Sequence, residues 1–376
     1  MPDFYEFFSG GGMARIGLGP EWDCLLANDI DEKKAAAYQA NFCGAPELRI
    51  CDVANLTTTD LPGVAALAWA SFPCQDLSLA GNRGGLGAER SGAFWPFWRL
   101  IQGLATENRL PRLIVLENVS GALTSHGGQD FLVIAETLAQ AGYNFGALVI
   151  DAVHFLPQSR PRLFVIAALG EMEVPAIVRS KAPESFWHPP ALCERVSELS
   201  PEVRRRWIWW RLPVPAPRQT AFVDVIEDKP LGVQWHTPAE TQRLLSLMSE
   251  VNRAKVRMAQ TSGRRMVGGV YKRTRNGVQR AEVRFDGVAG CLRTPVGGSS
   301  RQVILIVENK RIRSRLLSPR EAARLMGLPE SYALPERYND AYYIAGDGLA
   351  VPVVRYLAEN ILEPVLAGEE QLAAAG

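Results

Sequence analysis

The first 170 residues alternate short apolar runs with stretches of helical periodicity, and this alternation restricts the fold more than any other feature of the chain. Helical segments are expected at about 31–42, 92–106 and 129–141, and another begins at Met13. Short apolar runs between helices are typical of buried parallel strands. We therefore predict an α/β fold with a doubly wound, mainly parallel sheet. The runs end near Phe8, Ala27, Cys51, Phe72, Leu116, Ile150 and Ala168.

The alternation stops near residue 172, where the character of the chain changes. Residues 174–217 are rich in Pro, Trp and Arg, whereas residues 267–307 consist of strand-like segments between glycine-rich turns. A chain of 376 residues also exceeds the usual size of a single core. We predict a large domain, a smaller β-rich domain and a C-terminal segment that returns to the first domain, at residues 1–172, 173–325 and 326–376.

Two local signals stand out in the second half of the chain. Ser318 followed by Pro319 predicts the start of a helix, with the serine as N-cap. The cluster Trp207, Trp209 and Trp210 is expected to pack in a core, because large aromatic side chains dominate small cores. Stacking of these tryptophans on nucleic-acid bases is the alternative.

Composition excludes several classes of protein. No run approaches the roughly 20 apolar residues of a membrane span, and residues 1–8 lack the basic segment of a secretory signal. The six cysteines form no Cys-x-x-Cys pair, and none of the four histidines has metal-ligand spacing. We therefore expect a cytosolic protein of a reducing compartment. We expect it to have no metal site and no disulfide framework.

The charge of the chain is strongly segregated. The net charge is only +1, but residues 251–320 hold 17 Lys or Arg against 3 Asp or Glu. Such an excess is often a solvated face, yet here the cations are mostly arginines distributed among strand-like stretches. The pattern favours a polyanionic partner.

A thiol and a carboxyl group follow two of the apolar runs. Cys74 comes two residues after Phe72, and Glu117 directly follows Leu116. Ligands of open α/β sheets bind beyond the carboxyl ends of the strands, so both groups are expected to face one crevice. A thiolate beside a carboxylic acid suits covalent attack on an electron-poor ring whose nitrogen the acid holds. A lone cysteine is more often structural, but the polar continuation at 75–78 favours a shaped loop.

A glycine turn follows the first apolar run. The spacing of Gly10, Gly12 and Gly17 departs from the fingerprint of dinucleotide enzymes, although a strand, a turn and a helix in this order place backbone N–H groups beside a ligand. Asp29 lies near the offset at which an acid binds ribose hydroxyls, and Asp52 is placed to accept from an adenine amino group. Each aspartate alone is more often a helix cap. Together they indicate an adenosine-containing cofactor.

Taken in order, these segments resemble the motifs of the cytosine-C5 DNA methyltransferase family. The resemblance covers nearly the whole chain apart from residues 172–280, where members of the family differ. One motif departs from the family pattern, because Asp347 stands where Asn is usual, and Glu6 stands where the family often has Asp. The matching segments are Phe8–Gly12, Asn28–Ile30, Asp52–Val53, Pro73–Gln75, Glu117–Val119, Gln158–Arg162, Arg293–Thr294, Leu316–Gly327 and Gly346–Pro352.

The resemblance implies a class I methyltransferase whose Rossmann-like catalytic domain binds S-adenosylmethionine, and a second domain that recognises the DNA target. It implies double-stranded DNA as partner, no membrane and no obligatory protein partner, and a monomer in the bacterial cytosol, associated with the nucleoid. The implied cofactor residues are Phe8, Ser9, Gly10, Gly12, Asp29, Ile30, Asp52, Val53, Pro73, Asp347 and Ala350. The implied DNA contacts are Gln75, Ser78, Asn82, Arg83, Asn118, Gln158, Arg293 and Thr294.

The resemblance also implies the chemistry. The Cys74 thiolate attacks C6 of cytosine so that C5 can take the methyl group, while Glu117 holds N3. Arg162, and with it Arg160, meets the cytosine O2. None of these atoms is reachable inside a stacked duplex, so the base is flipped out. The glycine-rich segment 80–91 resembles the mobile catalytic loop of the family.

Three other functions compete with this hypothesis. An RNA cytosine-C5 methyltransferase shares the motifs, but the long arginine-rich region favours duplex DNA. A DNA-binding scaffold without activity has no reason to keep the thiol, the acid and the arginines together. A nicotinamide oxidoreductase fits neither the glycine spacing nor the paired thiol and acid. The sequence leaves open the DNA target and whether the enzyme belongs to a restriction-modification system.

Overall fold

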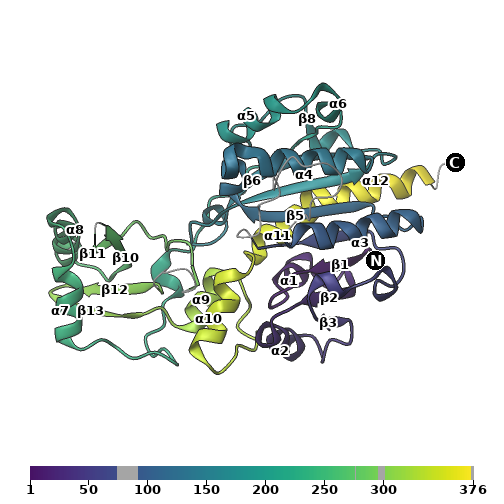
Figure 1. Ribbon diagram of the computed structural model, residues 1–376. Helices are drawn as coiled ribbons and strands as arrows, with labels where there is room; N and C mark the ends of the chain where they lie inside the picture. The colour runs from purple at the N-terminus through teal and green to yellow at the C-terminus, as the bar shows by residue number, and fades with distance from the viewer. Residues whose placement is uncertain (74–91, 276, 295–300, 374–376) are drawn as a thin grey trace. The chain divides into compact units, whose positions relative to one another are not determined.

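The computed structural model describes residues 1–73, 92–275, 277–294 and 301–373, which fold into two compact units (Figure 1). Both units are discontinuous in sequence, because the chain passes between them after residues 150, 160, 214 and 352. Unit 1 comprises Met1–Ile150, Pro161–Val214 and Val353–Gly376, and unit 2 comprises Asp151–Arg160 and Pro215–Pro352.

Unit 1 is built on a seven-stranded sheet in the order β3-β2-β1-β4-β5-β7-β6. The pairs among β1 to β5 are parallel, whereas β7 runs antiparallel to β5. This arrangement confirms the doubly wound, mainly parallel sheet expected from the alternation of apolar runs and helices. The strands are β1 (Asp3–Phe7), β2 (Asp23–Asp29), β3 (Leu48–Ile50), β4 (Leu67–Ala70), β5 (Leu113–Val119), β6 (Tyr143–Asp151) and β7 (Pro161–Leu169).

Helices pack on this sheet, and its central strands are buried and mainly apolar, although they also carry buried acids, Glu6 in β1 and Glu117 in β5. Helix α3 turns Phe94, Phe97, Ile101 and Leu104 to the core, and the ring of Phe97 packs edge-on against Phe7 of β1. This spacing places the four side chains on one helical stripe. The helices at the predicted positions are α1 (Met13–Leu18), α2 (Glu32–Asn41), α3 (Phe94–Thr106) and α4 (Gln129–Gln140).

Residues 173–214 pack on unit 1, which moves the boundary from the predicted residue 172 to 214. Trp210 is fully buried and its indole N–H donates to the carbonyl of Ile166 in β7, while Trp187 donates to Leu212. Trp207 and Trp209 are half-buried and pack against the core of unit 1, so the predicted cluster packs in a core. The elements of the region are β8 (Arg179–Ser180), β9 (Trp209–Trp210), α5 (Pro190–Glu198) and α6 (Pro201–Arg204).

The C-terminal segment joins unit 1 from Val353, whereas the predicted return to the first domain began at residue 326. It continues without a break through α11 (Val351–Leu357), a π-helical segment, η9 (Ala358–Leu362), and α12 (Glu363–Ala373). Arg355 donates to the carbonyl of Leu18, so this segment joins unit 1. No helix in the described part of the chain combines the length and the apolar character that a bilayer span requires.

Unit 2 contains the β-rich domain that the sequence predicts. Its four strands form an antiparallel sheet in the order β11-β10-β12-β13, and α7 and α8 pack on one face through residues such as Leu244 and Val256. Val270 and Val283 of the sheet face these helices. The elements are α7 (Pro238–Ser246), α8 (Glu250–Thr261), β10 (Met266–Arg275), β11 (Val278–Arg284), β12 (Val303–Glu308), β13 (Arg311–Leu316), α9 (Pro319–Leu325) and α10 (Tyr338–Asp347).

Short 3-10 turns complete both units. They are η1 (Val53–Asn55), η2 (Thr58–Asp60), η4 (Ser120–Leu123), η5 (Ser125–Gly128), η6 (Ala152–His154), η7 (Ala176–Val178) and η8 (Phe222–Val225).

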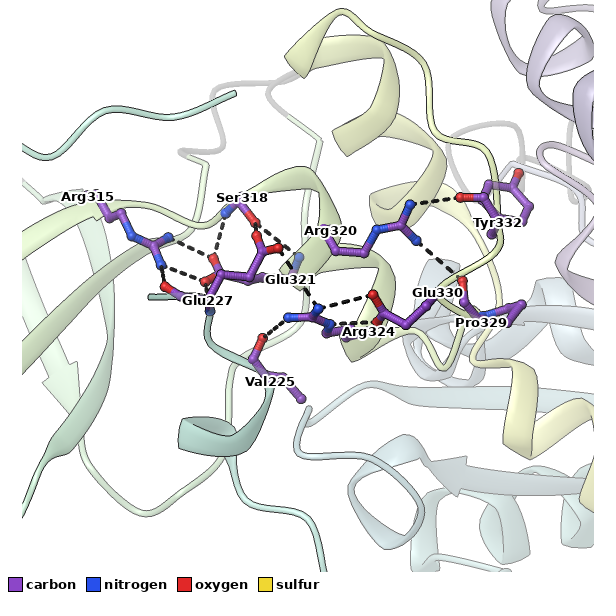
Figure 2. Close-up of polar contacts among 10 residues, drawn as sticks. All are labelled: Val225, Glu227, Arg315, Ser318, Arg320, Glu321, Arg324, Pro329, Glu330 and Tyr332. Carbon is purple, nitrogen blue, oxygen red and sulfur yellow. Dashed lines mark hydrogen bonds and ion pairs between the residues drawn. The ribbon is translucent and has the colours of Figure 1, made fainter. Parts of the chain in front are cut away.

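A buried ion pair joins β13 to α9 (Figure 2). Arg315 and Glu321 are both fully buried, and two guanidinium nitrogens lie 2.6 and 2.7 Å from the two carboxylate oxygens. Ser318 caps α9 as predicted, because its hydroxyl accepts from the Glu321 N–H while the Glu321 carboxylate accepts from the Ser318 N–H. Glu227 adds a further layer, with its N–H donating to Glu321 and its carbonyl accepting from Arg315. The capping box and the ion pair therefore share one carboxylate.

We expect Glu321→Gln to lower the free energy of unfolding by ~3–5 kcal/mol, because it leaves the buried Arg315 charge without its counter-ion. Urea unfolding followed by circular dichroism measures this loss. The matched control is Glu330→Gln, since the Glu330 partner of Arg324 is 63% exposed and such surface pairs contribute about 0–1 kcal/mol. Equal unfolding midpoints for the two variants would contradict the prediction.

Candidate active site

The turn after β1 is tied to the end of β2 by a carboxylate. The Gly10 N–H donates to Oδ2 of Asp29 at 2.7 Å, and the Asp31 N–H donates to Oδ1 of the same side chain at 2.8 Å. The Ser9 N–H donates to the carbonyl of Asn28. The structure therefore brings together the glycine turn and the aspartate that the sequence predicted at one cofactor.

One side of this turn is open and the other is packed. A Cβ added to Gly10 would meet no atom within 4 Å, whereas one added to Gly12 would lie 2.3 Å from the ring of Phe42. Ile30, at the end of β2, is 66% exposed. An open backbone turn beside an exposed apolar side chain suits a ligand with a polar end and a flat ring, such as S-adenosylmethionine.

Other predicted cofactor residues have more ordinary roles in their local structure. Phe8 adopts a positive φ of 58° and forms the first residue of the turn. Asp52 is exposed and caps η1 by accepting from the Ala54 N–H at 2.8 Å, which is the alternative role that the sequence left open. Val53 is buried in the core, and Pro73 is exposed beyond the end of β4.

A buried polar network lies beneath the glycine turn. Glu6 of β1 is 1% exposed, and its Oε2 accepts from the Tyr38 hydroxyl at 3.3 Å. The Tyr38 hydroxyl in turn accepts from Arg15 at 3.1 Å, and Arg15 pairs with Glu47. Burial raises the pKa of the Glu6 carboxyl to about 8, because the charged form is poorly solvated there. The only sequence signal for this network was an acid within an apolar strand.

A second group of residues gathers at the carboxyl end of β5. This strand extends to Val119, so Glu117 lies inside the strand, two residues before its end, and does not follow it. Because β7 is antiparallel to β5, its first residues pair with the last residues of β5, and Val119 lies opposite Arg162. Glu117 and Arg162 consequently share one face of the sheet. The Arg162 Nε lies 3.1 Å from Oε1 of Glu117, and both side chains are largely buried.

The acid motif is also linked to the chain that leads to the predicted nucleophile. The Asn118 side-chain amide donates to the carbonyl of Phe72 at 3.1 Å, two residues before Cys74. Asn118 was predicted to contact DNA, and sequence spacing held no sign of this link. The predicted residues Cys74, Gln75, Ser78, Asn82 and Arg83, with the segment 80–91, lie outside the described residues.

The remaining predicted site residues belong to unit 2. Arg293 and Asp347 are exposed, whereas Thr294 is half-buried and Ala350 is buried. Gln158 and Arg160 are buried and donate to backbone carbonyls within this unit. Within the described residues, no group of three or more His, Cys, Asp and Glu side chains is arranged to hold a metal ion.

The sheet of unit 2 presents arginines on the face that α7 and α8 do not cover. Strand alternation places Arg273 and Arg280 on the face opposite Val270 and Val283, and the register sets the two arginines directly across from each other. Like charges in this position repel, and Glu282 on the same face lies 3.8 Å from Arg273 and offsets part of this repulsion. A polyanion lying against this face would offset the rest.

Comparison with known proteins decides the family. The model of the C-5 cytosine-specific DNA methylase family matches residues 3–363. The chain belongs to this family. It is therefore an S-adenosylmethionine-dependent enzyme that transfers a methyl group to C5 of cytosine in DNA, as the motif order implied.

Individual members of the C-5 cytosine-specific DNA methylase family align along almost their full length. The chain is 27% identical over 365 residues to the type II methyltransferase M.Bsp6I of Bacillus sp. (strain RFL6), which covers 94% of this chain and 97% of that protein. It is 24% identical over 362 residues to M.HhaI of Haemophilus parahaemolyticus, with 95% and 93% covered.

Solved structures share the fold of this methylase. The Dnmt2 methyltransferase of S. pombe superimposes with a TM-score of 0.60 at 19% identity, covering 97% of this chain and 99% of that chain. The Entamoeba histolytica methyltransferase EhMeth gives a TM-score of 0.62 at 14% identity, with 96% and 98% covered.

We expect Glu6→Gln to flatten the dependence of stability on pH. The pKa of Glu6 in the folded methylase, about 8, lies above its ordinary value of 4.5, so the folded state binds the proton more tightly than the unfolded state. The stability that this proton provides is complete below about pH 4.5 and is lost as the pH rises towards 8, by up to ~1.4 kcal/mol per pH unit.

Urea unfolding of the wild type and of Glu6→Gln between pH 5 and 8 measures the effect. The difference in unfolding free energy between the two proteins should change with pH, in the direction that favours the variant at high pH. Glu21→Gln, at an exposed glutamate, should follow the wild type. Parallel curves for the wild type and Glu6→Gln would refute the assignment.

Proposed function

We propose that this DNA cytosine-5 methyltransferase acts through Cys74 as nucleophile, Glu117 as the acid at N3 and Arg162 at O2 of a flipped cytosine. The observation that carries the proposal is the 3.1 Å contact between Arg162 and Glu117 at the carboxyl end of β5. N3 and O2 are adjacent on the pyrimidine ring. A carboxyl group can share a proton with N3 while the neighbouring guanidinium donates to O2.

The proposed reaction uses each group once. The Cys74 thiolate forms a bond to C6, and Glu117 shares a proton with N3 so that the charge entering the ring is offset. Bound S-adenosylmethionine supplies the methyl group that C5 takes. The C5 proton is then lost to water, and the electron pair of the C5–H bond re-forms the C5–C6 double bond and expels the sulfur from C6. The Cys74 thiolate is restored as 5-methylcytosine is released.

The turn of unit 1 is proposed to hold the cofactor. Its open side at Gly10, with the neighbouring N–H groups, fits the polar methionine end, and the exposed Ile30 fits an adenine ring. Asp29 holds Gly10 through one oxygen, and a carboxylate oxygen has lone pairs for a further hydroxyl. The proposed contacts also include Phe8, Ser9, Gly12, Asp52, Val53, Pro73, Asp347 and Ala350.

Unit 2 is proposed to recognise the DNA target. Its arginine-bearing sheet face provides phosphate contacts, and Gln75, Ser78, Asn82, Arg83, Asn118, Gln158, Arg293 and Thr294 remain proposed DNA contacts. By analogy with its type II relatives, we propose a restriction-modification enzyme that acts on a specific duplex sequence. We also propose a monomer in the bacterial cytosol, as the resemblance in sequence motifs implies. Sedimentation analysis tests the monomer, and bisulfite sequencing of DNA from cells that express the chain tests the target.

Cys74→Ser is expected to abolish methyl transfer from labelled S-adenosylmethionine to DNA while leaving cofactor binding unchanged, because only the thiolate attacks C6. The wild type should form a covalent adduct with duplex DNA that carries 5-fluorocytosine, and the variant should not. Cys43→Ser, which changes an exposed cysteine, should behave as the wild type in both assays. Methyl transfer by Cys74→Ser at the wild-type rate would remove Cys74 from the mechanism.

Glu117→Gln is expected to lower the single-turnover rate by about 10²–10⁴-fold, the usual contribution of a positioned acid or base, because an amide cannot deliver a proton to N3. Rapid-quench measurement at saturating DNA and cofactor isolates this step. Glu136→Gln, on the exposed side of α4, is the control. An unchanged rate for Glu117→Gln would show that another group provides the proton.

A further inference from the structure

Arg160 lies among backbone carbonyls from two distant segments of unit 2. It is 2% exposed, and its Nη2 donates to the carbonyls of Gly346 and Gly348 at 3.0 and 2.7 Å. Its Nη1 donates to the carbonyl of Leu292 at 3.3 Å. The guanidinium therefore grips the chain on both sides of Asp347 and immediately before Arg293.

Gln158 binds the backbone of Leu292 together with Arg160. Its Oε1 accepts from the Leu292 N–H at 3.2 Å, and its Nε2 donates to the carbonyl of Leu325 at 2.6 Å. Both backbone polar groups of Leu292 are thus bound by side chains from the loop 158–160. Buried backbone groups require such partners, so the position of this segment depends on the two side chains.

The loop that carries these side chains is itself fixed. Asp151 accepts from the Arg160 N–H at 2.6 Å through Oδ1 and from the Ser159 hydroxyl at 3.1 Å through Oδ2. The two gripped segments also touch each other, since a Cβ added to Gly346 would lie 3.0 Å from Cγ2 of Thr294. Arg160 thus lies on a preformed junction of three segments.

We propose that Arg160 is a positioning residue that locks the segment 292–294, assigned to DNA, against the segment 346–348, assigned to the cofactor. This proposal rests on the proposed function, and it replaces the expectation that Arg160 meets the cytosine O2, a role that stays with Arg162. A guanidinium suits the task because its donors form a rigid planar fork that reaches several carbonyls at once. Lysine has one nitrogen and cannot reproduce this geometry.

The decisive measurement is the affinity of the DNA-free protein for S-adenosylmethionine, by isothermal titration calorimetry. We expect Arg160→Lys and Arg160→Met to weaken it by about tenfold or more, equivalent to ~1.4 kcal/mol. With cofactor and DNA both saturating, the single-turnover rate should stay within about threefold of the wild type, a difference below 1 kcal/mol. A residue that contacts only the base would show the reverse pattern.

Arg218→Met is the matched control. Arg218 binds η6, the turn that precedes this loop, through the carbonyl of Val153 at 3.0 Å, and its partners include neither of the two gripped segments. It should keep the wild-type affinity for the cofactor. Hydrogen exchange measured by mass spectrometry should rise at residues 289–294 and 344–350 in Arg160→Lys, and not in Arg218→Met.

The proposal fails if Arg160→Lys binds the cofactor as the wild type does and loses its single-turnover rate. It also fails if both Arg160 variants and Arg218→Met lower the affinity for the cofactor equally, because the effect would then belong to residues 151–160 as a whole. If Arg160→Met does not fold, Arg160→Lys and its exchange pattern decide. Failure of the proposed function is separate, since it appears in the Cys74 and Glu117 variants while wild-type cofactor binding persists.

Discussion

The antiparallel pairing of β7 with β5 is the constraint on which the candidate active site depends. The parallel strands β1 to β5 bring useful side chains to one edge only, where their carboxyl ends meet. Reversal of β7 places the amino end of this strand at the same edge, so that Arg162 lies beside Glu117. If β7, a strand of nine residues, ran parallel to β5, Arg162 would lie at the opposite edge of the sheet, roughly 25 Å from Glu117.

Buried charged and acidic side chains organise the backbone in both units, and each avoids the cost of burial in its own way. Arg315 is neutralised by Glu321, Arg160 is bound by carbonyls, and burial favours the protonated form of Glu6, which accepts from a tyrosine. An unsatisfied buried polar group is expensive, so each of these side chains stabilises only one arrangement of its neighbours. For Arg160 this specificity matters to function, because its partners lie in the proposed DNA and cofactor segments.

Much of the fold could be predicted because the signals were local. The apolar runs marked the strands, and Ser318 and Pro319 marked the start of α9. The boundary at residue 214 was not predicted, and was placed near residue 172 instead, because residues 173–214 have irregular periodicity and yet pack in unit 1 through Trp187 and Trp210. The size and apolar character of a tryptophan side chain indicate that it is buried, but they do not reveal which core receives it.

The sequence by itself determined the order of the elements, the family and the chemical types available at the strand ends. Only the tertiary structure decided the partners of each side chain. Arg160 and Arg162 are two residues apart in one motif, yet the first belongs to unit 2 and binds carbonyls while the second belongs to unit 1 and meets Glu117. Sequence patterns report interactions over a few residues, whereas these partners lie far apart along the chain and are brought together by strand direction and packing.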